Sequence, residues 1–348
     1  MKSKKIIYLL VGLGVIVLFI TPLIISYSNL AFLPNQATFA ADNLVSQIPF
    51  LPKTTRQILV RSKIVNEKLN SYKTKTLLEI SGGGYKLVSV SIDGAIKDIN
   101  SEKVQSTTAF KGTTLYPVPL GFDFQTASFG KDLFFKVNQG AALPNFDTTT
   151  LGKVWYQTNL DSLQKDLKIS SRDDIDIIKD EKAKLEDYLA QLLKNKNLDG
   201  AKVTKVSKDG QTYHQITLKA DSEPLSQLIV GDSLKNKEVE VTVLIDEKSR
   251  FLKSFLIKAK KLTQDGKAVE IKFDYILSEQ NKNFSIEKPQ SIQTISSASD
   301  LYLLLNKSKK PSVEEVFQAL GAGAKESLAD FLTVERITRV VLLLPKAL

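Results

Sequence analysis

The chain has 348 residues, of which 43% are hydrophobic and 25% charged, a composition that indicates a folded protein and excludes wholesale disorder. Its 48 Lys and Arg outnumber its 38 Asp and Glu, but these charges are spread along the chain and no dense basic tract predicts nucleic-acid binding. The sequence has no cysteine, which excludes disulfides, thiol nucleophiles, Cys-ligated metals and the acylated cysteine of a lipobox.

An uncharged apolar run extends from Ile6 to Ile25 and is long enough to cross about 30 Å of hydrocarbon as a helix. Three lysines within residues 2–5 precede it, and no acidic residue does. The positive-inside rule therefore places the N-terminus in the cytoplasm and the rest of the chain outside a bacterial cytoplasmic membrane. We predict a cytoplasmic start and transmembrane signal-anchor over residues 1–26.

A cleaved signal peptide is the alternative to this anchor, because Thr38-Phe39-Ala40 before Ala41 has the small residues of a cleavage site. Either reading exports the chain. Residues 27–55 contain prolines without clean periodicity and predict a juxtamembrane stalk with a short helix at Asp42 to Gln47. The folded domain is expected to begin near Arg56, where apolar residues recur at helical spacing.

Alternating patterns predict strands through the first half of this domain. The expected strands are 75–80, 85–92, 104–110, 122–129, 132–137 and 154–158. Gly82-Gly83-Gly84 between the first two is a hairpin signal. An amphipathic helix is expected from about Asp173 to Lys194, with acidic residues at its positive end.

Strands resume at 201–206 and 213–218, joined by Asp209-Gly210, and a brief helix is expected at 224–230. Three longer strands, 238–245, 251–261 and 268–277, form a predicted meander with one buried face, since every second residue is apolar. Residues 296–348 are expected to form a C-terminal helical extension after a Ser/Gln-rich link.

Several segments together resemble the LolA/LppX-like lipoproteins and lipoprotein carriers. They are Ser71-Tyr72, the run GKDLFFK at 130–136, KVWY at 153–156, the meander at 239–261 and the ending FDYILSEQNKNFSIEKP at 273–289. The resemblance covers roughly residues 56–295. It implies an α+β fold: a highly curved antiparallel sheet, an incomplete barrel, with helices on its concave side, here preceded by one transmembrane helix.

Several members of that family bind acyl chains between sheet and helices. This sequence departs from the pattern because it lacks the lipobox cysteine, carries a predicted anchor and adds a helical tail. No ligand-contact residue of the family can be matched one to one, so the fold is implied more strongly than lipid transfer.

Sequence motifs for catalysis are weak. His214 is the sole histidine and has no cysteine to join it in a metal site. The glycine clusters at 82–84 and 321–323 do not match a phosphate-binding loop, and the acidic residues at 173–176 do not have the spacing of a calcium loop. We therefore predict no enzyme, no cofactor and no metal.

Two functions remain open. The first is an apolar-ligand module, in which a lipid or acyl chain enters a cavity between sheet and helices. The candidate cavity residues are Leu78, Ile80, Val88, Val90, Phe124, Phe135, Val241, Val243, Phe255, Ile257, Ile271 and Phe273. The second is a non-enzymatic envelope scaffold or sensor in which the same residues fill a solid core and the surface meets an unidentified protein partner.

Overall fold

A computed structural model gives the arrangement of a large part of the chain. It describes residues 26–27, 35–101, 103–114, 120–139, 142–143, 146–147, 151, 153–159, 198, 200–221, 238–262, 268–297, 300 and 304. Among these residues no helix combines the length and the apolar character that a membrane crossing requires. The predicted anchor, the helix at 173–194, the helix at 224–230 and almost all of the C-terminal extension lie outside the described residues.

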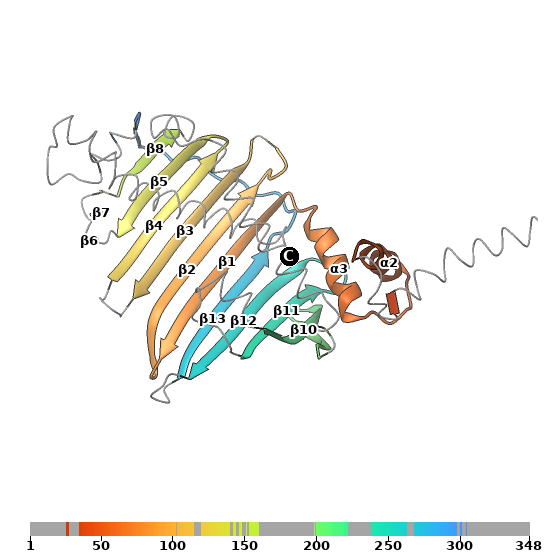
Figure 1. Ribbon diagram of the computed structural model, residues 1–348. Coiled ribbons are helices and arrows are strands. Elements are labelled where there is room, and N and C mark those ends of the chain that lie inside the picture. The colour runs from red at the N-terminus through yellow and green to blue at the C-terminus, as the bar shows by residue number, and fades with distance from the viewer. Residues whose placement is uncertain are drawn as a thin grey trace, which may run out of the picture.

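Among the described residues, helices α2 and α3 precede a large sheet (Figure 1). The helices are α2 (Asn35–Gln47) and α3 (Thr55–Asn66). The strands of the first half are β1 (Ser71–Gly82), β2 (Tyr85–Lys97), β3 (Gln105–Thr114), β4 (Leu120–Phe129), β5 (Asp132–Gln139), β6 (Ala142–Leu143), β7 (Phe146–Asp147) and β8 (Trp155–Asn159). Those of the second half are β9 (Lys202–Lys208), β10 (Gln211–Asp221), β11 (Glu238–Asp246), β12 (Leu252–Leu262), β13 (Ala268–Ser278) and β14 (Ile292–Thr294).

The main sheet has 12 strands in the order β14-β8-β5-β4-β3-β2-β1-β13-β12-β11-β10-β9. All of its neighbours pair antiparallel except β14, which pairs parallel with β8. Figure 1 shows that the sheet is curved, and its two outermost described strands do not pair with each other. The predicted curved, unclosed antiparallel sheet is therefore confirmed, and each long expected strand is present within a few residues of its predicted bounds.

Two of the predicted hairpin turns have the backbone that their glycines allow. Gly83 and Gly84 have φ of 59° and 85°, and Asp209 and Gly210 have φ of 52° and 74°. Two successive positive φ angles define the turn whose twist matches that of paired strands. The turn at Gly83-Gly84 starts the β1–β2 register, and a bulge between Ile80 and Ser81 shifts it by one residue, so that Leu78 pairs with Val90.

Each long strand presents one apolar and one polar face. In β11, Val239 and Val241 are 0% exposed whereas Glu240 between them is exposed. Residues paired across an antiparallel sheet share a face, so the register carries this division from β10 through β13 into β1 and β2. We call the two surfaces the apolar face and the polar face.

Helix α3 lies at one end of the apolar face. Thr54 caps its N-terminus in a reciprocal box with Gln57, and Ile58 packs among the buried residues of the sheet. At the other end of the helix, the backbone N–H of Leu252 donates to Asn66 Oδ1 at 3.3 Å. Because this contact ties the helix to the start of β12, we call this side of the apolar face the α3 end.

Helix α2 is longer than the short helix that the sequence predicts at Asp42 to Gln47, and it packs against α3. Buried Asp42 accepts a hydrogen bond from Ser26 Oγ at 2.6 Å and pairs with Arg56. Gln57 Nε2 donates to the same Ser26 oxygen at 2.7 Å. The sequence pattern missed this network because its polar partners are 14 to 31 residues apart.

A segment after β13, residues 279–291, crosses the polar face toward β14. Lys73 on β1 lies 5.2 Å from the centre of the Phe284 ring, and Lys288 lies 5.3 Å from that of Phe134 on β5. This outer strap brings residues 292–294 beside β8, where the sequence analysis expected only a link.

Candidate functional site

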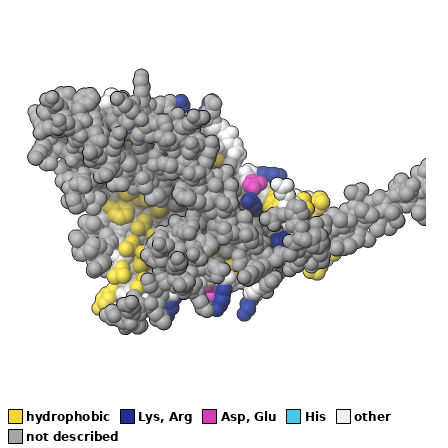
Figure 2. Space-filling model, in the orientation of Figure 1, with side chains coloured by type: hydrophobic (Ala, Val, Ile, Leu, Met, Phe, Trp, Pro, Cys, Tyr) yellow, Lys and Arg dark blue, Asp and Glu magenta, His cyan; other side chains and the backbone are white. Residues whose placement is uncertain are grey.

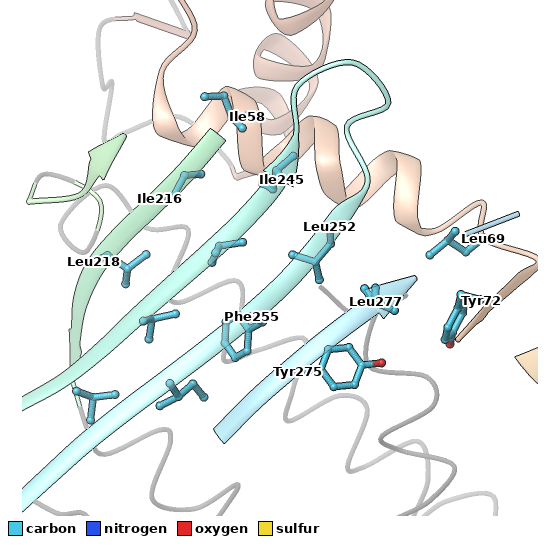
Figure 3. Close-up of a cluster of buried hydrophobic side chains, with 14 of the residues drawn as sticks. Ile58, Leu69, Tyr72, Ile216, Leu218, Ile245, Leu252, Phe255, Tyr275 and Leu277 are labelled. Atoms are coloured by element: carbon cyan, nitrogen blue, oxygen red, sulfur yellow. The ribbon is translucent and has the colours of Figure 1, made fainter. Parts of the chain in front are cut away.

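The buried cluster of the apolar face covers its α3 end and extends along β11, β12 and β13 (Figure 3). The cluster consists of Ile58, Leu69, Tyr72, Ile96, Ile216, Leu218, Val239, Val241, Val243, Ile245, Leu252, Phe255, Ile257, Ala259, Ile271, Tyr275 and Leu277. Tyr72 and Tyr275 are both 0% exposed, and burial raises the pKa of each phenol. The neutral phenols join the apolar packing, so this end is a solid core.

The same face is more open where β1 turns into β2. Leu78, Ile80, Val88, Val90 and Phe273 are all only partly buried. The register sets Leu78 between Val90 and Phe273, and pairs Ile80 with Val88. These five residues therefore form one continuous surface, which we call the hairpin-end patch.

A space-filling view agrees with this arrangement. Figure 2 shows hydrophobic side chains gathered over the part of the sheet where Figure 1 places β2 and β3. An accessible apolar surface on a sheet is a common feature of ligand and partner sites.

The predicted site residues all lie on the apolar face, but in different surroundings. Val241, Val243, Phe255, Ile257 and Ile271 belong to the buried cluster of the α3 end and of β11–β13. Leu78, Ile80, Val88, Val90 and Phe273 form the hairpin-end patch. Phe124 and Phe135 lie farther across the sheet, on β4 and β5.

An aromatic group continues the face beyond β2. Phe124 stacks on Phe110 with ring centres 4.6 Å apart, and Phe122 lies 5.9 Å from Phe124. A Cβ on Gly112 would meet the Phe122 ring at 2.1 Å, so this ring lies directly over the glycine backbone. The sequence analysis did not select Phe110 and Phe122, although the alternation of their strands would place both on the face of Phe124.

The far side of this aromatic group is filled. Phe135 is 4% exposed and stacks on Tyr156 with ring centres 5.3 Å apart. The accessible part of the face therefore lies between the core of the α3 end and this aromatic pair.

At the α3 end, His214 of β10 lies beside a charged side chain, that of Arg250. His214 is 7% exposed, and its Nε2 accepts from Arg250 Nη1 at 2.6 Å. Burial, followed by the Arg250 charge, lowers the pKa of His214. Burial and the same arginine lower the pKa of Lys53, whose ammonium donates to the carbonyls of Val45 in α2 and of Ile48 just after it. This histidine is held as a neutral acceptor within packed structure.

The polar face has an open hollow of ≈ 650 Å³ beneath the outer strap. It is lined by Thr107, Ala127, Trp155, Glu287, Lys288, Pro289 and Gln290. None of the predicted site residues lines it. Within the described ranges no group of three or more His, Asp or Glu side chains is placed to hold a metal ion.

No family model and no curated protein matches the chain. Among solved structures it is similar to LprF from Mycobacterium bovis, with 12% identity and a TM-score of 0.37 over 67% of this chain and 96% of that one. The lipoprotein LppX from Mycobacterium tuberculosis matches with 15% identity and a TM-score of 0.32, over 67% and 97%. A LolA superfamily protein from Nitrosomonas europaea matches with 9% identity and a TM-score of 0.18, over 68% and 96%.

Two of these names belong to the family that the sequence motifs resemble. The TM-scores are low, so the fold class rests on the sheet of this chain itself. Membership of the LolA/LppX-like group stays a prediction.

Proposed function

We propose that this chain is a membrane-anchored extracytoplasmic protein that binds a lipid or acyl chain on the apolar face of its sheet. The observation that carries this proposal is the hairpin-end patch, where neighbouring strands align partly buried aliphatic and aromatic side chains beside a solid core. Aliphatic surface of this kind accepts hydrocarbon without leaving polar groups unpaired. The ligand site is therefore Leu78, Ile80, Val88, Val90 and Phe273, extended by Phe122 and Phe124.

With the hairpin-end patch as the ligand site, only some of the predicted residues are suitable targets for a test of binding. Val243 is 7% exposed inside the core cluster, so a charge there would act on folding before it acts on a ligand. Val90, in contrast, is partly buried and lies on the accessible part of the face. A test of binding should therefore change the patch and leave the core intact.

The decisive experiment measures saturable uptake of a fluorescent fatty-acyl probe by the delipidated full-length chain in a lipid-free amphipol, with mass spectrometry of the lipid that co-purifies before delipidation. Val90→Asp should abolish uptake, because the carboxylate would be desolvated by a bound chain. Ser91→Asp is the matched control, since Ser91 is the next residue of β2 and faces the polar side. Thermal melting should show that both variants fold.

Absence of probe uptake and of co-purifying lipid in the unaltered protein would favour the scaffold or sensor function instead. Equal uptake by the two variants would remove the patch from the site while leaving lipid binding in place.

The membrane side of the proposal is supported at the helix pair. Ser26, the last residue of the predicted anchor segment, is buried and hydrogen-bonded to Asp42 and Gln57. Close by in the chain, Phe50 is 100% exposed, Leu44 56% and Tyr27 43%. The apolar loop and helix surface next to the end of a membrane helix suit the interfacial region of a bilayer. We infer that α2 and the loop after it rest on the membrane.

This orientation can be measured with tryptophan fluorescence, because Trp155 is the single tryptophan. In a Trp155→Phe background reconstituted in liposomes, Phe50→Trp should be quenched by brominated lipids. Tyr85→Trp is the control, since Tyr85 is 73% exposed in the β1–β2 turn, at the end of β1 away from α3. Equal quenching at both positions, or none at Phe50→Trp, would rule out the orientation.

A further inference from the structure

The outer strap is held on the polar face at two points and spans a row of short side chains between them. Paired residues of five neighbouring strands form this row, namely Lys73, Ala95, Thr107, Ala127 and Phe134. The two ends of the row hold the strap through the cation–ring contacts with Phe284 and Lys288. Two of the short middle residues line the hollow of ≈ 650 Å³, so the hollow lies where the strap passes over small side chains.

The only tryptophan of the chain, Trp155, lines the same hollow. Tyr156 stacks on Phe135 on the apolar face, so the alternation of β8 turns Trp155 toward the polar face. Trp155 is only partly buried. Its indole therefore offers a flat apolar surface at the wall of a hollow on the polar side of the sheet.

Polar side chains of the strap complete the wall. Glu287 supplies a carboxylate, and Gln290 supplies an amide that both donates and accepts hydrogen bonds. Both residues are exposed. Lys288 adds a positive charge and lies 3.9 Å from the carboxylate of Asp132. A bound anion would therefore meet Glu287, and a bound cation would meet Lys288, so the lining favours an uncharged ligand.

These walls suit a ligand that has one apolar face and many hydroxyl groups. Hydrocarbon would remove water from the carboxylate and the amide without replacing their hydrogen bonds. A sugar ring has C–H groups on one face, which can stack on an indole, and hydroxyl groups at its rim, which can donate to a carboxylate. The hollow also has the size of a small-ligand site, for which about 300–1,000 Å³ is usual.

We propose that the hollow beneath the outer strap binds a neutral oligosaccharide. One sugar ring stacks on Trp155, and its hydroxyl groups form hydrogen bonds with Glu287 and Gln290. The hollow lies on the polar face, so this site is separate from the hairpin-end patch and does not depend on the lipid proposed for that patch. The inference goes beyond the proposed function, because the same sheet would meet a glycan on one face and a lipid on the other.

The test uses the fluorescence of Trp155, which reports on the hollow directly because it is the only tryptophan. The full-length chain in a lipid-free amphipol is titrated with maltotriose, mannotriose and triacetylchitotriose. At least one of these sugars should change the emission saturably, with a Kd in the millimolar range or below. Saturation-transfer NMR measures the affinity for the same sugars in variants without the indole.

Two variants remove the proposed contacts. Trp155→Leu should weaken sugar binding about tenfold or more, since it deletes the stacking surface. Glu287→Ala should weaken it about tenfold, because a hydrogen bond to a charged group is lost. Glu270→Ala is the matched control, since Glu270 is also an exposed acid on the polar face, and it should bind sugar as the unaltered chain does. Thermal melting should show that both glutamate variants fold.

Three results would overturn the inference. They are the absence of a saturable response to all three sugars, equal sugar affinity of Glu287→Ala and Glu270→Ala, and tighter binding of a Pro-rich or Lys-rich peptide than of any sugar. If Trp155→Leu does not fold, the comparison of the two glutamate variants decides alone, because both changes are at exposed positions.

Discussion

The two ends of strand β1 on the apolar face are built from the same alternating pattern but are packed differently. At the α3 end Tyr72, Tyr275 and Leu277 are each 0% exposed, whereas Leu78 and Ile80 at the other end of β1 remain partly buried. A helix supplies Ile58 to the first region. The difference teaches that a single strand can contribute to a filled core along one half and to a partly exposed apolar surface along the other.

Two leucines on neighbouring strands measure this difference most directly. Leu277→Ala should destabilise the protein by about 4 kcal/mol, because it leaves a cavity in a filled core. Leu78→Ala should cost about 1 kcal/mol, since part of that side chain already meets solvent. Urea denaturation of the two variants checks the comparison, and equal losses would contradict it.

The ion pair at the α3 end should contribute more to stability than the ion pair near the β1–β2 turn. Asp42→Asn removes the 0% exposed carboxylate that pairs with Arg56 and should cost about 3 kcal/mol. Glu79→Gln, which removes the partner of exposed Lys86 near the β1–β2 turn, should cost less than about 1 kcal/mol. Denaturation at low and high salt provides the measurement, and a larger loss for Glu79→Gln would refute the contrast.

The packing of Phe122 over Gly112 can be tested by a double-mutant cycle. Gly112→Ala should destabilise the protein by about 2 kcal/mol, because the new methyl group would displace the ring. In a Phe122→Ala background the same change should be neutral or stabilising, since the ring is gone and alanine favours ordered backbone over glycine. Equal costs in both backgrounds would show that the ring does not depend on the glycine.

The smallest expected effect is a pH dependence confined to the α3 end. Burial and Arg250 lower the pKa of His214 in the folded state, so the unfolded chain binds the proton more readily. Stability should therefore be complete above the unfolded value of about 6.5 and decline as the pH falls below it. His214→Gln should remove this decline from thermal melts between pH 5 and 7. Because His214 is the only histidine, a decline that persists in the variant would assign the effect to other groups.

Much of the sheet could be predicted from the sequence because its signals are local. Alternation along β11 predicted which residues face the core, and Asp209-Gly210 predicted the hairpin between β9 and β10. All twelve candidate residues share the apolar face, as their strand parity requires. Such patterns extend over two to ten residues and need no knowledge of distant contacts.

The sequence analysis did not predict contacts between residues that are distant in the chain. The sequence analysis assigned Val243 and Val90 to one cavity, although the first lies in the core and the second in the patch. It gave no sign that Ser26 would meet Gln57, or that β14 would join β8.

The sequence by itself determined the strands, their turns and the apolar character of one face, since these follow from side-chain periodicity and backbone preference. Only the tertiary structure decided which part of that face is filled. Filling a surface requires side chains from elsewhere in the chain, as Ile58 of α3 joins the cluster that contains Ile216 and Ile245, and no local pattern specifies where they will come from.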